Sequence, residues 1–265
     1  MHKVIIRYIS LVIVLSAVTL IFGCRSADTP PIEEPPTIED PVTEEPAYEP
    51  EDPSETEPPA TEDDPYELYE VEPERVLRPA IADMREYYGN DHIIGYIYIE
   101  GTSIHYPVTQ YTDNEFYLYH DIWGNPDRAG WIFLDYENDI TREDPNVIIY
   151  GHNMRRDIRF HSIRHYANRD FFDAHRYITF NTAYSEYRWE IFSFYITCIN
   201  FFYIQVIFQS DEEFYGLLAE MKARSMHDSG VEVGRGDRVL TLSTCVGNPE
   251  NERFVVNARL IRDEG

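Results

Sequence analysis

The stretch Val239-Leu240-Thr241-Leu242-Ser243-Thr244-Cys245 is a short apolar segment that ends on a cysteine. After a loop over residues 246–252, a second apolar segment begins at Arg253 and runs to Ile261. Their length and β-branched content predict that both segments are strands. If the two strands pair, the Cys245 thiol and the Arg253 guanidinium lie at the same edge of a sheet, where rigid strand ends can hold reacting groups.

Cys245 has more than one interpretation. A cysteine with a histidine elsewhere in the chain is a candidate nucleophile, because the two groups meet in space rather than in sequence. A lone cysteine after an apolar strand is more often a core residue, since cysteine is among the most buried residue types. A disulfide with Cys198 is a third alternative, although Cys198 ends a strand-like run and is itself expected in the core.

Composition divides the 265 residues into three parts. Residues 1–24 are basic and then apolar. Residues 25–75 contain 19 acidic residues and 12 prolines, which predicts a disordered, extended stalk. Residues 76–265 contain 29 acidic and 18 basic residues, with aromatic and β-branched residues throughout, and are long enough for one well-formed core.

The first 24 residues predict export and attachment to a membrane. Positive charges precede the apolar run, so the positive-inside rule places the remainder on the extracellular face of the cell membrane. Two forms of attachment stay open. The uncharged run Tyr8–Gly23 suits a signal-anchor, whereas Leu20-Ile21-Phe22-Gly23-Cys24 resembles the lipid-attachment box of bacterial lipoproteins, in which Cys24 would be lipidated.

The third part predicts a mainly β domain of around eight short strands, closed or nearly closed into a barrel, with a few helices inserted. The expected strands are His92–Glu100, Ile104–Val108, Trp131–Leu134, Asn146–Tyr150, Tyr177–Thr182, Trp189–Thr197, Tyr203–Phe208 and the two C-terminal segments. The expected helices are Val76–Tyr88, one or two turns in Asp113–His120, two short helices in residues 155–175, and Asp211–Ala223 with its apolar stripe.

A second reactive residue follows a buried strand: Asn146–Tyr150 ends in Gly151-His152. Histidine can give or take a proton near neutral pH, although a histidine at a strand end is usually an ordinary polar residue. His161 and His165 have a spacing that could bind metal, but no third ligand is evident, so neither metal nor cofactor is expected. The sequence contains no basic stripe and no phosphate loop, which argues against nucleic acid and nucleotide partners.

Three motifs in this order resemble the class B sortases, which are Gram-positive surface cysteine transpeptidases. They are Tyr150-Gly151-His152-Asn153-Met154, Thr241–Cys245 and Arg253-Phe254-Val255-Val256. Upstream segments match the class B pattern in the same order: Gly95–Thr102, Tyr106-Pro107-Val108, Asn114–Leu118 and Gly130–Tyr136. The resemblance covers roughly residues 76–265 and leaves out the long acidic stalk. It implies an eight-stranded barrel with an N-terminal helix and a helix inserted before the last two strands.

The resemblance also implies a mechanism. Cys245 would attack the carbonyl carbon of a threonine in a substrate sorting signal and form a thioacyl enzyme. His152 would protonate the leaving amine and later deprotonate the incoming amine, and Arg253 would hold the substrate or the oxyanion. Arg259 is a rival for the arginine role, but six residues along a strand place it roughly 20 Å away.

Other groove residues follow from position. Ser243 and Tyr150 share faces with Cys245 and His152 because each lies two residues away along a strand. Asn114, Leu118 and Thr244 match substrate-binding positions of the family, although a helix cap and a core leucine are equally ordinary roles for the first two.

The predicted partners are therefore a sorting-signal peptide and a cell-wall peptide amine of the lipid II type. Two other functions stay open. One is a pilin-polymerising sortase, against which the sequence lacks an obvious lid segment. The other is a catalytically silent, peptide-binding surface lipoprotein, against which stand the intact Cys245, His152 and Arg253.

Overall fold

The computed structural model describes residues 75–198, 200–245 and 252–262. The predicted N-terminal membrane segment with Cys24, and the predicted stalk apart from Arg75, lie outside the described residues. Among the helices that are described, none is long and apolar enough to cross a membrane.

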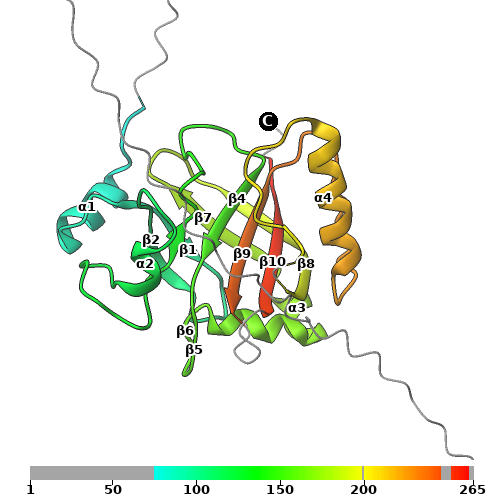
Figure 1. The fold of residues 1–265 in the computed structure, drawn as a ribbon, viewed down its shortest axis with the longest axis horizontal. Coiled ribbons are helices and arrows are strands. Elements are labelled where there is room, and N and C mark those ends of the chain that lie inside the picture. Colours follow the sequence, from blue (N-terminus) through cyan, green and yellow to red (C-terminus); the bar gives the residue numbers. More distant parts are fainter. Residues whose placement is uncertain (1–74, 199, 246–251, 263–265) are drawn as a thin grey trace, which may run out of the picture. The chain divides into compact units, whose positions relative to one another are not determined.

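Eight strands close into one barrel, which confirms the predicted fold class (Figure 1). Around the barrel the order is β1-β2-β3-β4-β9-β10-β8-β7. Two neighbouring pairs, β2 with β3 and β4 with β9, are parallel, and the remaining pairs are antiparallel. The strand bounds are β1 Ile93–Tyr98, β2 His105–Thr109, β3 Phe133–Leu134, β4 Asn146–Tyr150, β7 Tyr177–Thr182, β8 Arg188–Cys198, β9 Val239–Cys245 and β10 Glu252–Leu260.

The helices lie outside the barrel. Their bounds are α1 Pro79–Tyr88, α2 Phe116–Tyr119, the 3₁₀ helix η1 His161–Ala167, α3 Arg169–Ala174 and α4 Asp211–Arg224. The N-terminal helix and the helix between β8 and β9 were both expected. In α4, the Ser210 side chain accepts from Glu213 N, and three acidic residues occupy the first turn, where the helix dipole favours negative charge.

The barrel strands near the C-terminus are packed on both faces. Leu240, Leu242 and Val256 point into the main core inside the barrel. On the outer face, Val255 packs in a second cluster that includes Leu218 of α4, and Figure 1 shows α4 running alongside β8 and β10. Each fully buried aliphatic side chain contributes roughly 1.5–3 kcal/mol, so the backbones of β9 and β10 are held firmly.

The predicted strand Tyr203–Phe208 is wrong. The segment is irregular, because a closed barrel leaves no strand edge for a ninth member. Its carbonyl groups find other donors: Asn146 Nδ2 donates to Tyr203 O at 3.1 Å and to Gln205 O at 2.9 Å. This segment is therefore fixed to the barrel as a loop rather than as a strand.

Two smaller expectations also change. The predicted strand Trp131–Leu134 shrinks to β3, because Trp131 N donates to Tyr117 O at 2.7 Å instead of joining the sheet. The predicted helical region of residues 155–175 begins with a small hairpin of β5 (Asn153–Met154) and β6 (Ile158–Arg159) before η1 starts.

Candidate active site

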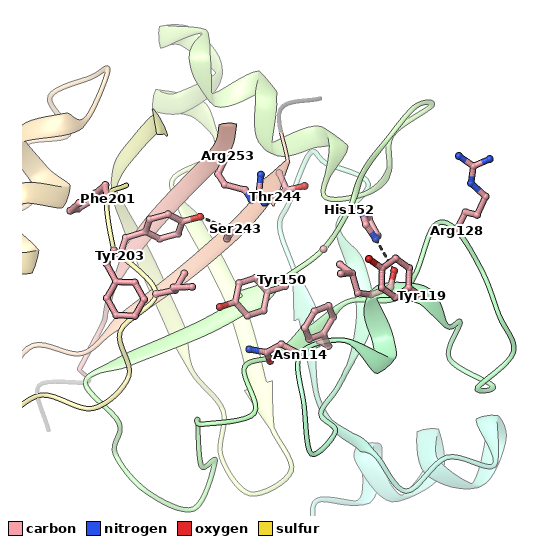
Figure 2. Close-up of a pocket in the computed structure, with 15 residues that line it drawn as sticks. Asn114, Tyr119, Arg128, Tyr150, His152, Phe201, Tyr203, Ser243, Thr244 and Arg253 are labelled. Carbon is pink, nitrogen blue, oxygen red and sulfur yellow. Dashed lines mark hydrogen bonds between the residues drawn. The ribbon is translucent and has the colours of Figure 1, made fainter. Parts of the chain in front are cut away.

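A groove of about 850 Å³ runs along the outer face of the barrel (Figure 2). Its lining comes from α2 and the loops before and after it, from β3, from the ends of β4, β9 and β10, and from the irregular segment after β8. The lining residues are Asn114, Leu118, Tyr119, Arg128, Phe133, Tyr150, Gly151, His152, Phe201, Phe202, Tyr203, Ile204, Ser243, Thr244 and Arg253. All described members of the predicted site except Cys245 are in this set.

The parallel pairing of β4 with β9 brings two of the predicted catalytic residues to one end of the barrel. Tyr150 lies opposite Ser243 in this pairing. His152 comes two residues after Tyr150, and Cys245 comes two residues after Ser243. Because parallel strands advance in the same direction, His152 and Cys245 leave the sheet at the same level.

Cys245 is described only through its backbone, as the last residue of β9. Its side chain and residues 246–251 lie outside the described part, so its role as nucleophile stays a prediction. The backbone register does argue against a disulfide with Cys198. Those two cysteines lie on strands that flank β10 on opposite sides, which separates them by two strand spacings, roughly 9.5 Å, beyond the Cα separation that a disulfide spans.

His152 is half-buried and its ring is oriented by a backbone carbonyl. Nε2 lies 2.8 Å from Leu118 O. Since a carbonyl oxygen only accepts, Nε2 carries the proton in this contact, and Nδ1 is then the nitrogen through which the neutral ring can accept a proton. The backbone is fixed as well, because Phe160 N donates to His152 O at 3.0 Å.

Two glycines allow this arrangement. A Cβ on Gly151 would lie 2.4 Å from Ile132 Cδ1 and 2.9 Å from Phe160 Cγ, so a larger residue here would displace the core side chains beneath the chain after β4. Gly130 has a φ of +53°, and a Cβ there would lie 2.6 Å from Leu118 O and 3.0 Å from His152 Cδ2. The absence of a side chain at both positions therefore leaves room for the His152 ring and for the Leu118 carbonyl that it contacts.

A buried arginine supports the loop that contains Gly130. Arg159 donates from Nε to Gly130 O at 2.9 Å, and its guanidinium lies 4.1 Å from the centre of the Trp131 ring. Burial lowers the pKa of Arg159. Its φ is +59°, a conformation that costs a non-glycine residue about 1 kcal/mol or more. Sequence reasoning missed Arg159, since one arginine among several in residues 155–169 has no distinguishing pattern.

Arg253 lies directly opposite Cys245 in the antiparallel pairing of β9 and β10. It is half-buried at the groove, and Nη1 donates to Glu252 O at 3.0 Å. Arg259 lies opposite Val239, at the other end of the same strand. The structure thus places Arg253, and not Arg259, beside the end of β9 at Cys245.

The groove carries positive charge in a domain that is acidic overall. Among its described lining residues, Arg128 and Arg253 are cations and none is an acid. Nearby cations favour a thiolate over a thiol and attract developing negative charge. This sign of charge suits a cysteine nucleophile at the end of β9.

The α2 side of the groove contains Asn114 and Leu118. Leu118 lines the groove and also provides the carbonyl that contacts His152, a backbone role that the sequence did not suggest. Asn114 Nδ2 donates to Asp135 Oδ2 at 3.0 Å, and Asn114 Oδ1 accepts from Tyr136 N at 3.0 Å. Neither residue is only a helix cap or a core side chain.

The β9 side of the groove contains Ser243 and Thr244, both 3% exposed. Ser243 Oγ lies 2.7 Å from Tyr203 OH. This contact ties β9 to the irregular segment that follows β8. Phe201, Phe202 and Ile204 of that segment form an apolar wall of the groove that sequence reasoning missed. Ile204 was expected in the strand Tyr203–Phe208, and Phe201 and Phe202 directly precede that strand.

His161 and His165 both face the carboxylate of Asp157. Their Nε2 atoms lie 3.9 and 3.6 Å from Asp157 Oδ1. In residues 75–198, 200–245 and 252–262, no group of three or more His, Cys, Asp and Glu side chains is arranged to hold a metal ion.

Comparisons with known proteins agree with this geometry. A family model described as "Sortase domain" matches residues 97–261. Sortase B of Listeria monocytogenes is 36% identical over 187 residues, which is 70% of this chain and 75% of that protein. Sortase B of Staphylococcus aureus is 34% identical over 188 residues, which is 70% of this chain and 76% of that protein.

Solved structures give the same answer. A Staphylococcus aureus sortase B–substrate complex superposes with a TM-score of 0.67 at 33% identity, covering 71% of this chain and 88% of the other. Clostridium perfringens sortase B superposes with a TM-score of 0.64 at 35% identity, covering 68% and 99%. The chain belongs to the sortase family of cysteine transpeptidases, and within it to class B.

Proposed function

We propose that this protein cleaves the sorting signal of surface proteins after a threonine and transfers the new carboxyl end to a cell-wall peptide amine. The observation that carries the proposal is the convergence of His152, the end of β9 at Cys245, and Arg253 at one groove. These are an acid–base group, a candidate thiol and a guanidinium, and they lie just after β4, at the end of β9 and at the start of β10.

The proposed reaction has two halves. The Cys245 thiolate attacks the threonine carbonyl carbon, and the oxygen becomes an oxyanion beside Arg253. The oxyanion collapses, the C–N bond breaks, and the leaving amine takes a proton from His152. An acceptor amine then gives a proton to His152 and attacks the thioester, which releases the thiolate and forms a new amide.

Each residue type suits its step. General acid–base assistance is typically worth about 10²–10⁴-fold, and a histidine near neutral pH serves both directions. Arginine offers several donors in a fixed planar fork to an oxyanion, whereas lysine offers only a point charge. A thiolate is both a strong nucleophile and an adequate leaving group.

The groove supports a peptide as the substrate. Its lining combines apolar side chains, such as Leu118 and Phe202, with polar ones, such as Asn114 and Arg253. The related Staphylococcus aureus structure is described as a substrate complex. On the membrane side, we propose that residues 1–24 tether the enzyme at the extracellular face, by a signal-anchor or through lipidated Cys24, with residues 25–75 as a spacer.

The test uses the full-length chain in detergent and a panel of fluorogenic peptides that vary around a central threonine. We expect cleavage after threonine and, with an added amine acceptor, a new amide product detectable by mass spectrometry. Cys245→Ala provides the matched control. An absence of cleavage across the panel, or equal cleavage by the Cys245→Ala variant, would refute the proposal.

A further inference from the structure

A buried carboxylate lies behind one wall of the groove, at Asp135. This residue follows β3 and is 3% exposed. Asp135 Oδ1 accepts from Glu137 N at 2.9 Å. Asp135 Oδ2 accepts from two side chains, Tyr150 OH at 2.7 Å and Asn114 Nδ2 at 3.0 Å. Tyr150 and Asn114 line the groove, whereas Asp135 does not. The carboxylate can therefore influence the groove only through these two side chains.

The Asn114 side chain is held in one orientation. Its oxygen accepts from Tyr136 N at 3.0 Å, and its nitrogen donates to the Asp135 carboxylate. A flipped amide would set oxygen against carboxylate and NH₂ against N–H, and both contacts would be repulsive. Since Nδ2 carries two hydrogens and Asp135 uses one, the fixed amide has a second N–H for the groove.

Tyr150 is held by the same oxygen. Burial, together with the neighbouring Asp135, raises the pKa of Tyr150, so its hydroxyl remains a donor at physiological pH. The Tyr150 ring packs against Phe133 with centroids 5.3 Å apart. Figure 2 shows Tyr150 and Asn114 together on the groove wall, with His152 further along the same side.

We propose that Asp135 is a positioning residue for peptide binding, which fixes Asn114 so that its remaining N–H donates to a carbonyl oxygen of the bound peptide. The inference rests on the proposed peptidase function. A donor that is fixed before binding loses little conformational entropy when the peptide arrives. Such a contact, made to a carbonyl away from the reacting bond, exists equally in the ground state and the transition state, and therefore acts on KM more than on kcat.

A purely structural role for Asp135 makes a different prediction. A buried carboxylate with three neutral donors stabilises the fold, and its loss leaves those donors unsatisfied. That loss would lower the melting temperature without changing the peptide KM of the folded fraction. The two roles are separated by kinetics measured on folded protein.

The experiment is a double-mutant cycle on the full-length chain, with Asn114→Ala, Asp135→Ala and the double variant, assayed for KM and kcat on the best sorting peptide. We expect each single variant to raise KM about tenfold, the equivalent of one hydrogen bond, with kcat within about threefold of wild type. We expect the double variant to be no worse than Asn114→Ala alone, because Asp135→Ala acts on KM through the Asn114 donor, which Asn114→Ala has already removed.

Asp135→Asn provides a second route if Asp135→Ala does not fold. An asparagine keeps the shape but has one acceptor oxygen, so it can serve either Glu137 N or the groove side chains, and we expect an intermediate rise in KM. The matched control is Asp144→Asn. Asp144 is also buried and accepts from Asn138 Nδ2 at 3.1 Å and Asp139 N at 2.7 Å. It does not line the groove, so its loss lowers stability and leaves KM unchanged.

The outcomes are distinct. The positioning role is overturned if the increases in KM of the two single variants multiply in the double variant, or if the Asp135 variants have the wild-type KM. Either result leaves the proposed function intact. A wild-type enzyme that cleaves none of the sorting peptides overturns the proposed function, and the positioning role falls with it.

Discussion

The two ends of β10 carry the same residue type in different surroundings. Arg253 lies opposite Cys245 and lines the groove. Arg259 lies opposite Val239, where Nη1 donates to Glu232 O at 2.8 Å and Nη2 lies 3.3 Å from Glu190 Oε2. The Arg253 guanidinium lies at the groove, whereas the Arg259 guanidinium binds a carbonyl and a carboxylate of the protein itself. Position along the strand, rather than residue type, separates a candidate catalytic arginine from a structural one.

The largest expected effect is on the rate of peptide cleavage, and it distinguishes Cys245 from Cys198 by their positions in the barrel. Cys245→Ala should reduce peptide cleavage by about 10⁴-fold or more, because the nucleophile is removed. Cys198→Ala should leave the cleavage rate within about twofold, since Cys198 lies on the far side of β10. Steady-state cleavage of the same peptide measures both. A strong loss of peptide cleavage in Cys198→Ala, at an unchanged melting temperature, would contradict the different roles given to the two cysteines.

The next effect tests the two arginines directly. Arg253→Lys should lower kcat about 100-fold, because lysine keeps the charge without the planar fork of donors. Arg259→Lys, the matched control, should retain wild-type kcat and lose at most about 1 kcal/mol of unfolding free energy, as expected for a partly exposed ion pair. Equal loss of kcat in both variants would show that position on β10 does not matter.

A smaller effect is expected at Gly130. An added Cβ in Gly130→Ala would meet Leu118 O at 2.6 Å and His152 Cδ2 at 3.0 Å, so the histidine moves and kcat falls about tenfold. Gly230→Ala is the control, because Gly230 has a φ of +71° and nothing within 4 Å of the added atom. Both variants carry the same backbone strain, and only the first is expected to slow the reaction.

The smallest effect at neutral pH concerns Tyr150. Its pKa is raised in the folded protein by burial and by Asp135. A raised folded pKa means that the stabilisation is complete below the unfolded value of about 10 and is lost as pH rises above it, by about 1.4 kcal/mol per pH unit for each such group. Urea unfolding between pH 8 and 11 should show this decline.

Tyr150→Phe should flatten part of that alkaline decline, because the variant has no hydroxyl to ionise. Tyr166 and Tyr195 are also buried with raised pKa values, so part of the slope should persist. An unchanged slope in Tyr150→Phe would contradict the placement of this hydroxyl against the Asp135 carboxylate.

Much of this site was predictable from the sequence because its parts sit at strand ends. Apolar runs before His152 and Cys245 and after Arg253 marked three buried strands, and their ends carried reactive side chains. The resemblance to class B sortases then implied an eight-stranded barrel, which the structure confirms. Periodicity alone could not have shown that β4 pairs with β9 in parallel.

The parts that were missed depend on tertiary contacts. Residues 203–208 have strand-like composition, yet a closed barrel offers them no edge, and their first two residues, Tyr203 and Ile204, line the groove instead. Arg159 acts through partners 28 and 29 positions away in the chain, and Asp135 through groove partners 15 and 21 positions away. Single-sequence patterns carry no signal for such pairs.

In the proposed reaction, the nucleophile is the Cys245 thiolate at the end of β9. The most direct test of this assignment is mass spectrometry of the full-length chain after brief incubation with a cleavable sorting peptide and acid quenching. We expect a thioester adduct, equal in mass to the amino-terminal peptide fragment minus water, on the proteolytic fragment that contains Cys245. An adduct on the fragment that contains Cys198, or turnover with no adduct on Cys245 under conditions that trap acyl enzymes, would contradict it.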